Sequence, residues 1–183
     1  SIARWNGTSW SSLGNPGPVV MALAVLPNGD LVAGGELGSS SALKRWSGSG
    51  WSSMGLFGGS QPAARSLLAL PNGDLFVGGW LETVNGVTVN HVARWSAGSW
   101  SPLANGVMSG GFDNVNSLTL LPNGDVVAGG SFIGTGAPGT AHLARWDGTA
   151  WNPLAGGTDG DIRAVAALSD GSCVAAGTTR LFD

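Results

Sequence analysis

Four residues with ligand-binding potential recur at one spacing along the chain. Each lies six residues before a Pro-Asn-Gly-Asp turn or its degenerate last copy: Met21, Arg65, Asn116 and Arg163. They begin equivalent apolar segments, which we expect to form the innermost strands of repeated sheets. Such strand starts would surround the mouth of a central channel, where two guanidinium groups could hold a carboxylate or a sulfate. The alternative is that they are solvated strand ends.

Trp80 is the one tryptophan of nine that falls outside the repeat pattern, at a site held by Glu36 and Ser131 in sister copies. An extra aromatic ring on a loop rim could stack on a sugar or a peptide through its apolar face and its single donor. The alternative is that Trp80 covers a neighbouring loop. A glycan or protein ligand is therefore one hypothesis for this chain.

A pair of histidines could indicate a metal site. His91 and His142 each lie four residues before a repeated tryptophan. We expect them on third strands, about two strand spacings of 4.8 Å from the innermost strand, where neighbouring sheets have splayed apart. Shared ligation is therefore not expected. The sequence also lacks an Asp-x-Asp-x-Asp-Gly calcium loop, so we expect neither metal nor other cofactor.

Catalysis would need a nucleophile, a base and an orienting group in one cleft. Neither histidine falls in the expected cleft. Asp159 and Asp161 could in principle form a glycosidase pair, but neighbouring acidic residues in a loop are usually just solvated. We therefore expect a non-catalytic protein, with a glycoside hydrolase as the least favoured alternative.

The elements that position these residues come from an internal repeat. Arg-Trp occurs at Arg4-Trp5, Arg45-Trp46, Arg94-Trp95 and Arg145-Trp146, and each tryptophan is followed five residues later by another: Trp10, Trp51, Trp100 and Trp151. The turn occurs at Pro27–Asp30, Pro71–Asp74 and Pro122–Asp125, and as Ser169–Ser172 in the last copy. A period of about 40–50 residues is typical of propellers and related repeat arrays.

Each repeat predicts four antiparallel strands. Asn-Gly between two apolar runs predicts a hairpin with a type I′ turn, and the Arg-Trp segment predicts a second hairpin with both tryptophans on one face. The first strand is apolar on both faces, as in a sheet sandwiched between neighbours. The fold prediction is therefore an all-β propeller made of four-stranded antiparallel blades.

The chain holds four blades' worth of strands, divided at about 1–14, 15–54, 55–103, 104–154 and 155–183. The first segment supplies the outer two strands of a blade and the last supplies the inner two. We expect these half-blades to pair, because unpaired strand edges are exposed otherwise. Pairing within one chain would give a four-bladed monomer, and pairing between two chains an eight-bladed homodimer, which we favour slightly.

Two repeated features resemble the kelch repeat. Glycine doublets close the second strands, at Gly34-Gly35, Gly78-Gly79 and Gly129-Gly130, and tryptophans open the fourth strands, at Trp51, Trp100 and Trp151. The full pattern, Leu-Pro-Asn-Gly-Asp-Leu-Val-Ala-Gly-Gly followed by Ala-Arg-Trp-x-Gly-x-x-Trp, is still more similar to the blades of multi-repeat secreted bacterial proteins and of the fungal cortical-polarity marker family. The tryptophan spacing differs from that of kelch. The resemblance implies a platform for binding or display, and its motifs specify the blade rather than a ligand.

Composition narrows the function classes. Charged residues make up 10% of the chain and the net charge is −3, so we expect no nucleic-acid partner. No apolar run reaches the length of about 18 residues typical of a membrane helix, so we expect no membrane insertion. The single cysteine, Cys173, takes a position held elsewhere by core aliphatic residues. Low charge and polar loops favour a secreted origin.

The loops between blades and between second and third strands vary in length and should share one rim, where function on rigid scaffolds usually lies. The segments are Glu36–Ser41, Gly55–Ala64, Trp80–Asn90, Asn105–Asn114, Ser131–Ala141 and Gly156–Asp161. The leading hypothesis is a non-catalytic binding, display or self-assembling scaffold. A lectin-like module that uses Trp80 and the rim is the alternative.

Overall fold

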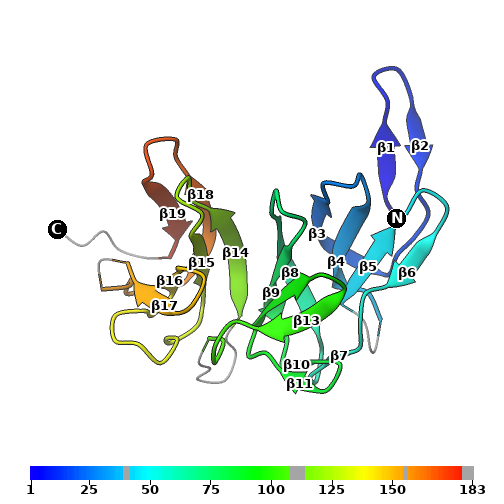
Figure 1. Ribbon diagram of the computed structural model, residues 1–183. Helices are drawn as coiled ribbons and strands as arrows, with labels where there is room; N and C mark the ends of the chain where they lie inside the picture. The colour runs from blue at the N-terminus through cyan, green and yellow to red at the C-terminus, as the bar shows by residue number, and fades with distance from the viewer. Residues whose placement is uncertain (39–41, 108–113, 155, 179–183) are drawn as a thin grey trace.

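The computed structural model describes residues 1–38, 42–107, 114–154 and 156–178. Within these ranges all regular structure is antiparallel β-sheet, which confirms the all-β prediction. The sheets stand side by side along an arc (Figure 1). No helix in these ranges is long and apolar enough to cross a membrane.

Three four-stranded sheets form the body of the molecule. Blade 1 has the order β3 (Val19–Val25), β4 (Leu31–Glu36), β5 (Leu43–Trp46) and β6 (Trp51–Ser53). Blade 2 has the order β8 (Ala63–Ala69), β9 (Leu75–Trp80), β12 (Val92–Ser96) and β13 (Ser99–Pro102). Blade 3 has the order β14 (Val115–Leu120), β15 (Val126–Gly130), β16 (Leu143–Trp146) and β17 (Trp151–Pro153).

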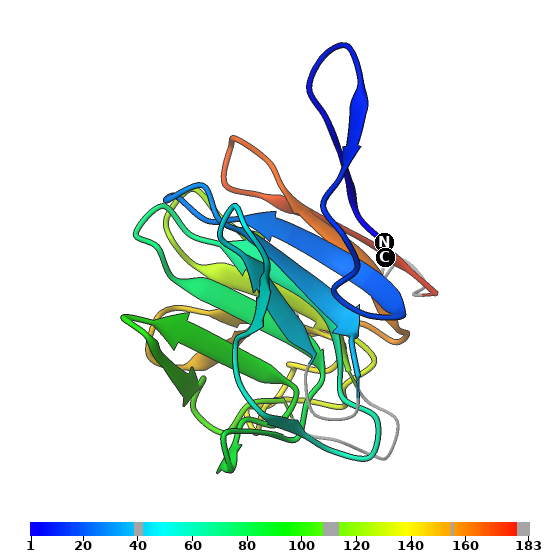
Figure 2. The same ribbon diagram turned by 90° about the vertical axis from the view of Figure 1, so that its right-hand side faces the viewer.

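Two hairpins flank these blades. The N-terminal hairpin pairs β1 (Ala3–Trp5) with β2 (Trp10–Ser12), and the C-terminal hairpin pairs β18 (Ile162–Ala167) with β19 (Cys173–Gly177). They lie at opposite ends of the arc in Figure 1, and the N-terminal hairpin projects beyond the sheets in Figure 2. Among the described strands β1 and β19 are not paired with each other, so closure of a ring stays a prediction.

A small additional sheet lies in the loops of blade 2. It has the order β11 (Val87–Thr88), β10 (Thr83–Val84) and β7 (Phe57–Gly58). The loop before blade 2 and the loop between its second and third strands are therefore joined by backbone pairing rather than independent.

The Pro-Asn-Gly-Asp segments form the predicted hairpins, but the predicted turn type is wrong. Gly29 has a φ of 87°, whereas Asn28 is absent from the positive-φ residues. The Gly29 N–H donates to the Leu26 carbonyl at 2.9 Å, and the Leu26 N–H donates to Asp30 at 2.9 Å. This is a type I turn followed by a left-handed glycine, which suits Pro27 because proline fixes φ near −65° at the first central position.

The paired tryptophans share one face, as predicted. Their ring centroids lie 5.2–5.5 Å apart in all four hairpins. The second tryptophan of a pair also donates through Nε1 to the preceding outer hairpin: Trp51 to the Leu13 carbonyl at 2.6 Å, Trp100 to Met54 at 2.5 Å and Trp151 to Leu103 at 3.0 Å. The Trp hairpins of blades 1, 2 and 3 therefore each fasten their blade to the outer hairpin that precedes it.

In the three four-stranded blades, the arginine of the Arg-Trp pair points to the opposite face and pairs with the aspartate of the turn. Arg45 Nε lies 2.6 Å from Asp30, Arg94 Nη2 lies 2.6 Å from Asp74 and Arg145 Nη1 lies 2.8 Å from Asp125. These aspartates therefore do more than follow a turn. They join the two hairpins of one blade.

Asp74→Asn should lower the free energy of unfolding by about 1–2 kcal/mol at neutral pH, because the charge-assisted hydrogen bond between the two hairpins is lost. Burial raises the pKa of Asp74, but hydrogen bonds from Ser96, Arg94 and Asn72 and the Arg94 charge outweigh burial, so the pKa is lowered. A lowered folded pKa adds stability above the ordinary value of 3.8, and this stability is lost as the pH falls through the folded pKa.

Urea denaturation of wild type and Asp74→Asn between about pH 6 and pH 2 measures this difference, which should shrink below about pH 4. Glu36→Gln, at an exposed carboxylate, is the control. A constant difference across the series would show that the Asp74 charge contributes nothing.

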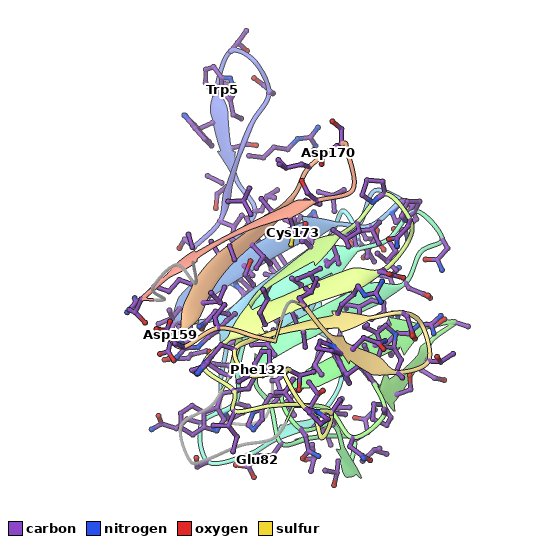
Figure 3. All side chains as sticks on the ribbon, turned by 90° about the vertical axis from the view of Figure 1, so that its left-hand side faces the viewer. Trp5, Glu82, Phe132, Asp159, Asp170 and Cys173 are labelled. Atoms are coloured by element: carbon purple, nitrogen blue, oxygen red, sulfur yellow. The ribbon has the colours of Figure 1, made fainter. Side chains whose placement is uncertain are left out.

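Apolar side chains fill the space between neighbouring blades, as the two-faced first strand predicts. Leu26 of blade 1 and Leu67 of blade 2 share one cluster, and Leu70 and Leu118 share the next. Leu121 and Val165 share the third, where blade 3 meets the C-terminal hairpin and Cys173 is half-buried (Figure 3). Each interface therefore joins the same two repeat positions.

Candidate functional site

Each innermost strand carries a one-residue β-bulge near its start. In β8, Ala64 pairs with Gly79 and Ser66 pairs with Gly78, so the intervening residue has no partner across the ladder. The same register shift occurs in β3, β14 and β18. A bulge re-aims the side chain of its extra residue. The four extra residues are the four that the sequence spacing singled out: Met21, Arg65, Asn116 and Arg163.

A glycine opposite each bulge makes room for it. A Cβ atom on Gly79 would lie 2.1 Å from the Ala63 carbonyl oxygen, and one on Gly35 would lie 2.1 Å from the Val19 oxygen. The corresponding distances are 2.0 Å at Gly130 and 1.9 Å at Gly177. The bulge therefore requires the second glycine of each doublet and, in the last copy, Gly177, which follows Ala176. The sequence alone shows these glycines as a repeated doublet but does not show the bulge that requires them.

The first glycine of the doublet has a different role. A Cβ atom on Gly78 would lie 2.4 Å from Cγ1 of Val115 in blade 3, and one on Gly129 would lie 2.5 Å from Cγ2 of Ile162 in the C-terminal hairpin. This glycine lets the next innermost strand approach closely. The doublet thus sets both the bulge and the distance between blades.

The four bulge residues line one pocket of about 460 Å³, together with Asn114, Ser131 and Asp161. The pocket lies where the innermost strands begin, and this place is called the channel mouth below. The structure therefore brings together all four residues predicted to surround the mouth. Both arginine side chains are exposed, and Asn116 is half-buried. The pocket combines cationic donors with neutral and anionic acceptors.

Three further residues complete the lining, and sequence reasoning did not place them there. Asn114 is 8% exposed, and its side-chain Oδ1 has no hydrogen-bond partner in the described ranges. Its backbone N–H donates to Ser131 Oγ at 3.1 Å. Asp161 lies 3.5 Å from Nδ1 of His142 and is half-exposed. Asn114, Ser131 and Asp161 flank the bulges from the loops that the sequence assigned to one rim.

Hydroxyl groups hold the innermost strands in place around the mouth. Ser66 and Ser117, which follow bulge residues, accept hydrogen bonds from Leu118 N at 2.9 Å and Val165 N at 3.0 Å in the next innermost strand. Asn116 Nδ2 donates to the Ile162 carbonyl at 2.8 Å. The spacing of the bulge side chains is thus fixed by contacts between blades.

Ser117→Ala should lower the free energy of unfolding by about 1 kcal/mol, because the Val165 N–H would lose its acceptor. Thermal unfolding monitored by tryptophan fluorescence measures the change. Ser52→Ala, at an exposed serine of β6, is the control and should have little effect. Equal effects at both positions would show that the bond between blades does not stabilise the mouth.

Trp80 is half-buried at the end of β9, opposite Ala63, and does not line the mouth pocket. Its counterpart Ser131 does line it. The structure therefore does not bring Trp80 together with the bulge residues. Parts of two predicted rim loops, residues 39–41 and 108–113, lie outside the described residues.

The histidines lie just before the third strands, which corrects their predicted placement within those strands. His91 has a φ of 72° and His142 a φ of 59°, and their carbonyls accept from Gly79 N at 3.1 Å and Gly130 N at 2.9 Å. Both residues therefore have a backbone role in joining second and third strands. The described ranges contain no group of three His, Cys, Asp or Glu residues that could hold a metal ion.

A second groove of about 570 Å³ lies at the turn end of blades 1 and 2. Its charged lining residues are Arg45, Asp74 and Arg94, which are ion-paired within their own blades. These charges are already neutralised by the fold. The channel mouth is therefore the stronger candidate site.

Comparisons with known proteins bear on the fold. Residues 70–97, from the turn of blade 2 to its Trp hairpin, match the model of a domain of unknown function (DUF5122) described as a β-propeller. Among curated proteins, none matches the chain. The matched segment is short and covers part of one repeat, from Leu70 at the turn to Ala97 in the Trp hairpin.

Two solved structures are similar to the chain, both of the BT4673 extracellular domain from B. thetaiotaomicron. One, from a protein described as a one-component system, has a TM-score of 0.62 at 15% identity over 93% of this chain. The other, described as a hybrid two-component system, has a TM-score of 0.60 at 17% identity over 87%. The chain spans only 22% and 20% of those chains. The likeness concerns the fold, and together with the matched model it shows that the chain has a β-propeller fold.

Proposed function

We propose that this chain is a non-catalytic β-propeller module that binds a ligand at its channel mouth. The observation that carries the proposal is the set of four bulges, which direct Met21, Arg65, Asn116 and Arg163 into one pocket. The turns and tryptophans of the repeats are nearly constant, whereas these four side chains differ in chemistry. Constant backbone with variable side chains is the arrangement expected of a binding surface on a rigid scaffold.

The lining favours binding over catalysis. It consists of two guanidinium groups, two carboxamides, a thioether, a hydroxyl and a carboxylate. His142, the imidazole beside Asp161, is not among the lining residues. A catalytic assignment would need a nucleophile and a base within hydrogen-bonding reach of one reacting atom.

The proposal also includes an extracellular location and a kelch-like repeat family. The similar solved structures are described as extracellular domains of a one-component and a hybrid two-component system. We infer that this module, too, meets its ligand outside the cell, in keeping with its kelch-like, secreted-type repeat pattern. A lectin-like role based on Trp80 has no support in the pocket lining. Glycans are therefore only one of the ligand classes in the screen described next.

A ligand screen followed by thermal unfolding tests the proposal. Small acids, neutral sugars and short peptides would be compared on wild type and on the double variant Arg65→Met with Arg163→Met. A ligand at a hundred times its Kd stabilises the folded protein by about 2.7 kcal/mol, which raises the Tm by several degrees in a protein of this size. We expect at least one class to do so in wild type only. No stabilising class, or equal stabilisation of both proteins, would overturn the proposal.

Self-association is a second candidate, carried by a different observation. At the interfaces between blades, Leu26 packs in one cluster with Leu67, and Leu70 in the next with Leu118. Leu168 holds the repeat position of Leu26 and Leu70, and Leu23 holds that of Leu67 and Leu118. These two have no such neighbour among the described residues and are 44% and 51% exposed. These two belong to opposite faces of the missing interface. Between β1 and β3 lies a groove of about 640 Å³, lined by Ile2, Leu23 and Val25 among others.

We propose that the C-terminal hairpin of a second copy fills this groove, with its β19 pairing with β1. The new blade would have the order β18, β19, β1 and β2, and its inner strand would bring Leu168 against Leu23. Light scattering at micromolar concentration tests this, and a homodimer is the expected mass. A monomer would overturn the proposal. Leu23→Asp should shift a dimer to monomer, because it places a charge in an apolar interface.

A further inference from the structure

We propose that the ligand of the channel mouth is a small molecule with a carboxylate beside a hydroxyl or ammonium group. This rests on the proposed binding function and specifies its ligand. The basis is the division of the pocket into cationic donors with no ion pair in the described ranges and acceptors that can take a hydrogen bond from a ligand. Each half is described in turn.

The donors are the guanidinium groups of Arg65 and Arg163. In the three four-stranded blades, the arginine of the Trp hairpin forms an ion pair with an aspartate of its own blade: Arg45, Arg94 and Arg145. In contrast, neither Arg65 nor Arg163 has a carboxylate within ion-pair distance among the described residues. A guanidinium fork matches the geometry of a carboxylate and can bind it through two hydrogen bonds. The two mouth arginines are therefore available to an anionic group.

The acceptors are Asn114 and Asp161. Asn114 is buried, lines the pocket, and leaves its Oδ1 atom without a partner in the described part of the chain. A buried acceptor left unsatisfied costs free energy, which a donor on a ligand would recover. The Asp161 carboxylate is half-exposed on the same lining. A ligand that carries only negative charge would be repelled by Asp161, so the bound molecule should also present a donor.

The size and layout of the pocket limit the ligand further. Its volume of about 460 Å³ is suited to a molecule of monosaccharide or amino-acid size. Asn116, between the two arginine-bearing strands, already donates to the Ile162 carbonyl and so helps fix the spacing of the donors. A hydroxy acid of the sugar series and an amino acid share the required chemistry.

Calorimetric titration of four probes tests the inference. Glucuronate and alanine carry the proposed groups, and their amides, glucuronamide and alaninamide, lack the carboxylate. We expect one acid to bind at least about tenfold more tightly than its amide, because charge-assisted bonds to two arginines are lost in the amide. Preference for glucuronate would identify a sugar acid as the source, and preference for alanine an amino acid. An acid and amide of equal affinity would overturn the inference.

Variants place the binding at the mouth. Arg65→Met and Arg163→Met should each weaken binding of the preferred acid about tenfold. Asn114→Leu should remove the part of the affinity that comes from the hydroxyl or ammonium group of the ligand. Arg4→Met, at an exposed arginine on the N-terminal hairpin, is the matched control and should bind as wild type does. Unchanged affinity in both mouth variants would also overturn the inference.

The outcome separates this inference from the function on which it rests. Neutral probes that bind wild type but not the double arginine variant would refute the carboxylate and leave a binding module standing. If no acid probe binds, the carboxylate assignment fails, and a wider screen that is also negative removes the binding function as well. Near-ultraviolet circular dichroism of the tryptophans would show that each variant keeps its fold.

Discussion

Gly79→Ala should destabilise the protein by about 3 kcal/mol or more, because overpacking against backbone cannot be relieved by a side-chain rotation. The added methyl group would lie 2.1 Å from the Ala63 carbonyl oxygen and 2.9 Å from the Arg65 nitrogen. Both atoms belong to the bulged strand. Relief would require the bulge itself to move, and a lower midpoint in urea denaturation would measure the cost.

Gly50→Ala is the matched control for this change. A methyl group there would meet nothing within 4 Å, and Gly50 does not have a positive φ. We expect its effect to stay within about 0.5 kcal/mol, as for most surface changes. If Gly79→Ala is equally mild, the bulge at Arg65 is not held as described. If the strand shifts instead of unfolding, the variant should fold but bind the mouth ligand weakly, because the Arg65 side chain is re-aimed.

The four-stranded pattern could be predicted because it rests on local rules. Asn-Gly turns and paired tryptophans act over fewer than ten residues, and alternation along a strand fixes which side chains share a face. The two tryptophans of each pair therefore lie on one face, as this alternation predicts. Asn-Gly alone does not determine the turn type, because the fixed φ of the preceding Pro27 favours a type I turn.

The bulges could not be predicted, although the residues on them were. A one-residue shift in register depends on how the inner strand fits against its neighbour, and no local propensity records it. The equal spacing of Arg65 and Arg163 before their turns was sufficient to align them. The repeated glycine opposite each bulge was the available signal, since a residue that must lack a Cβ marks a close approach of backbone.

The ion pairs between arginine and aspartate were missed because their partners lie 15–20 residues apart in different hairpins. Alternation along a strand puts each arginine on the face away from the tryptophans, but it does not put the arginine opposite a specific carboxylate. The last turn carries Ser172 where the others carry aspartate. A blade formed from the C-terminal and N-terminal hairpins would therefore lack this pair at Arg4.

Trp151→Ala should destabilise the protein by about 3–5 kcal/mol, the range for removing a buried aromatic side chain. Trp151 is 6% exposed, its ring centroid lies 5.4 Å from that of Trp146, and its Nε1 donates to the Leu103 carbonyl at 3.0 Å. The substitution removes the packing and the donor that fasten blade 3 to blade 2. Thermal and urea unfolding would both report the loss.

Trp10 occupies the same repeat position as Trp151. Comparing Trp10→Ala with Trp151→Ala therefore separates the contribution of the tryptophan pair from that of the neighbouring blade. Trp10 keeps its partner Trp5 at 5.5 Å but is 69% exposed, so Trp10→Ala should cost only about 1 kcal/mol in dilute protein. In the proposed dimer Trp10 would face the outer hairpin of a neighbouring blade, as Trp151 does. The cost of Trp10→Ala should then rise with protein concentration, because association stabilises the folded state by mass action. A cost that stays near 1 kcal/mol at every concentration would mean that the N-terminal hairpin remains uncovered.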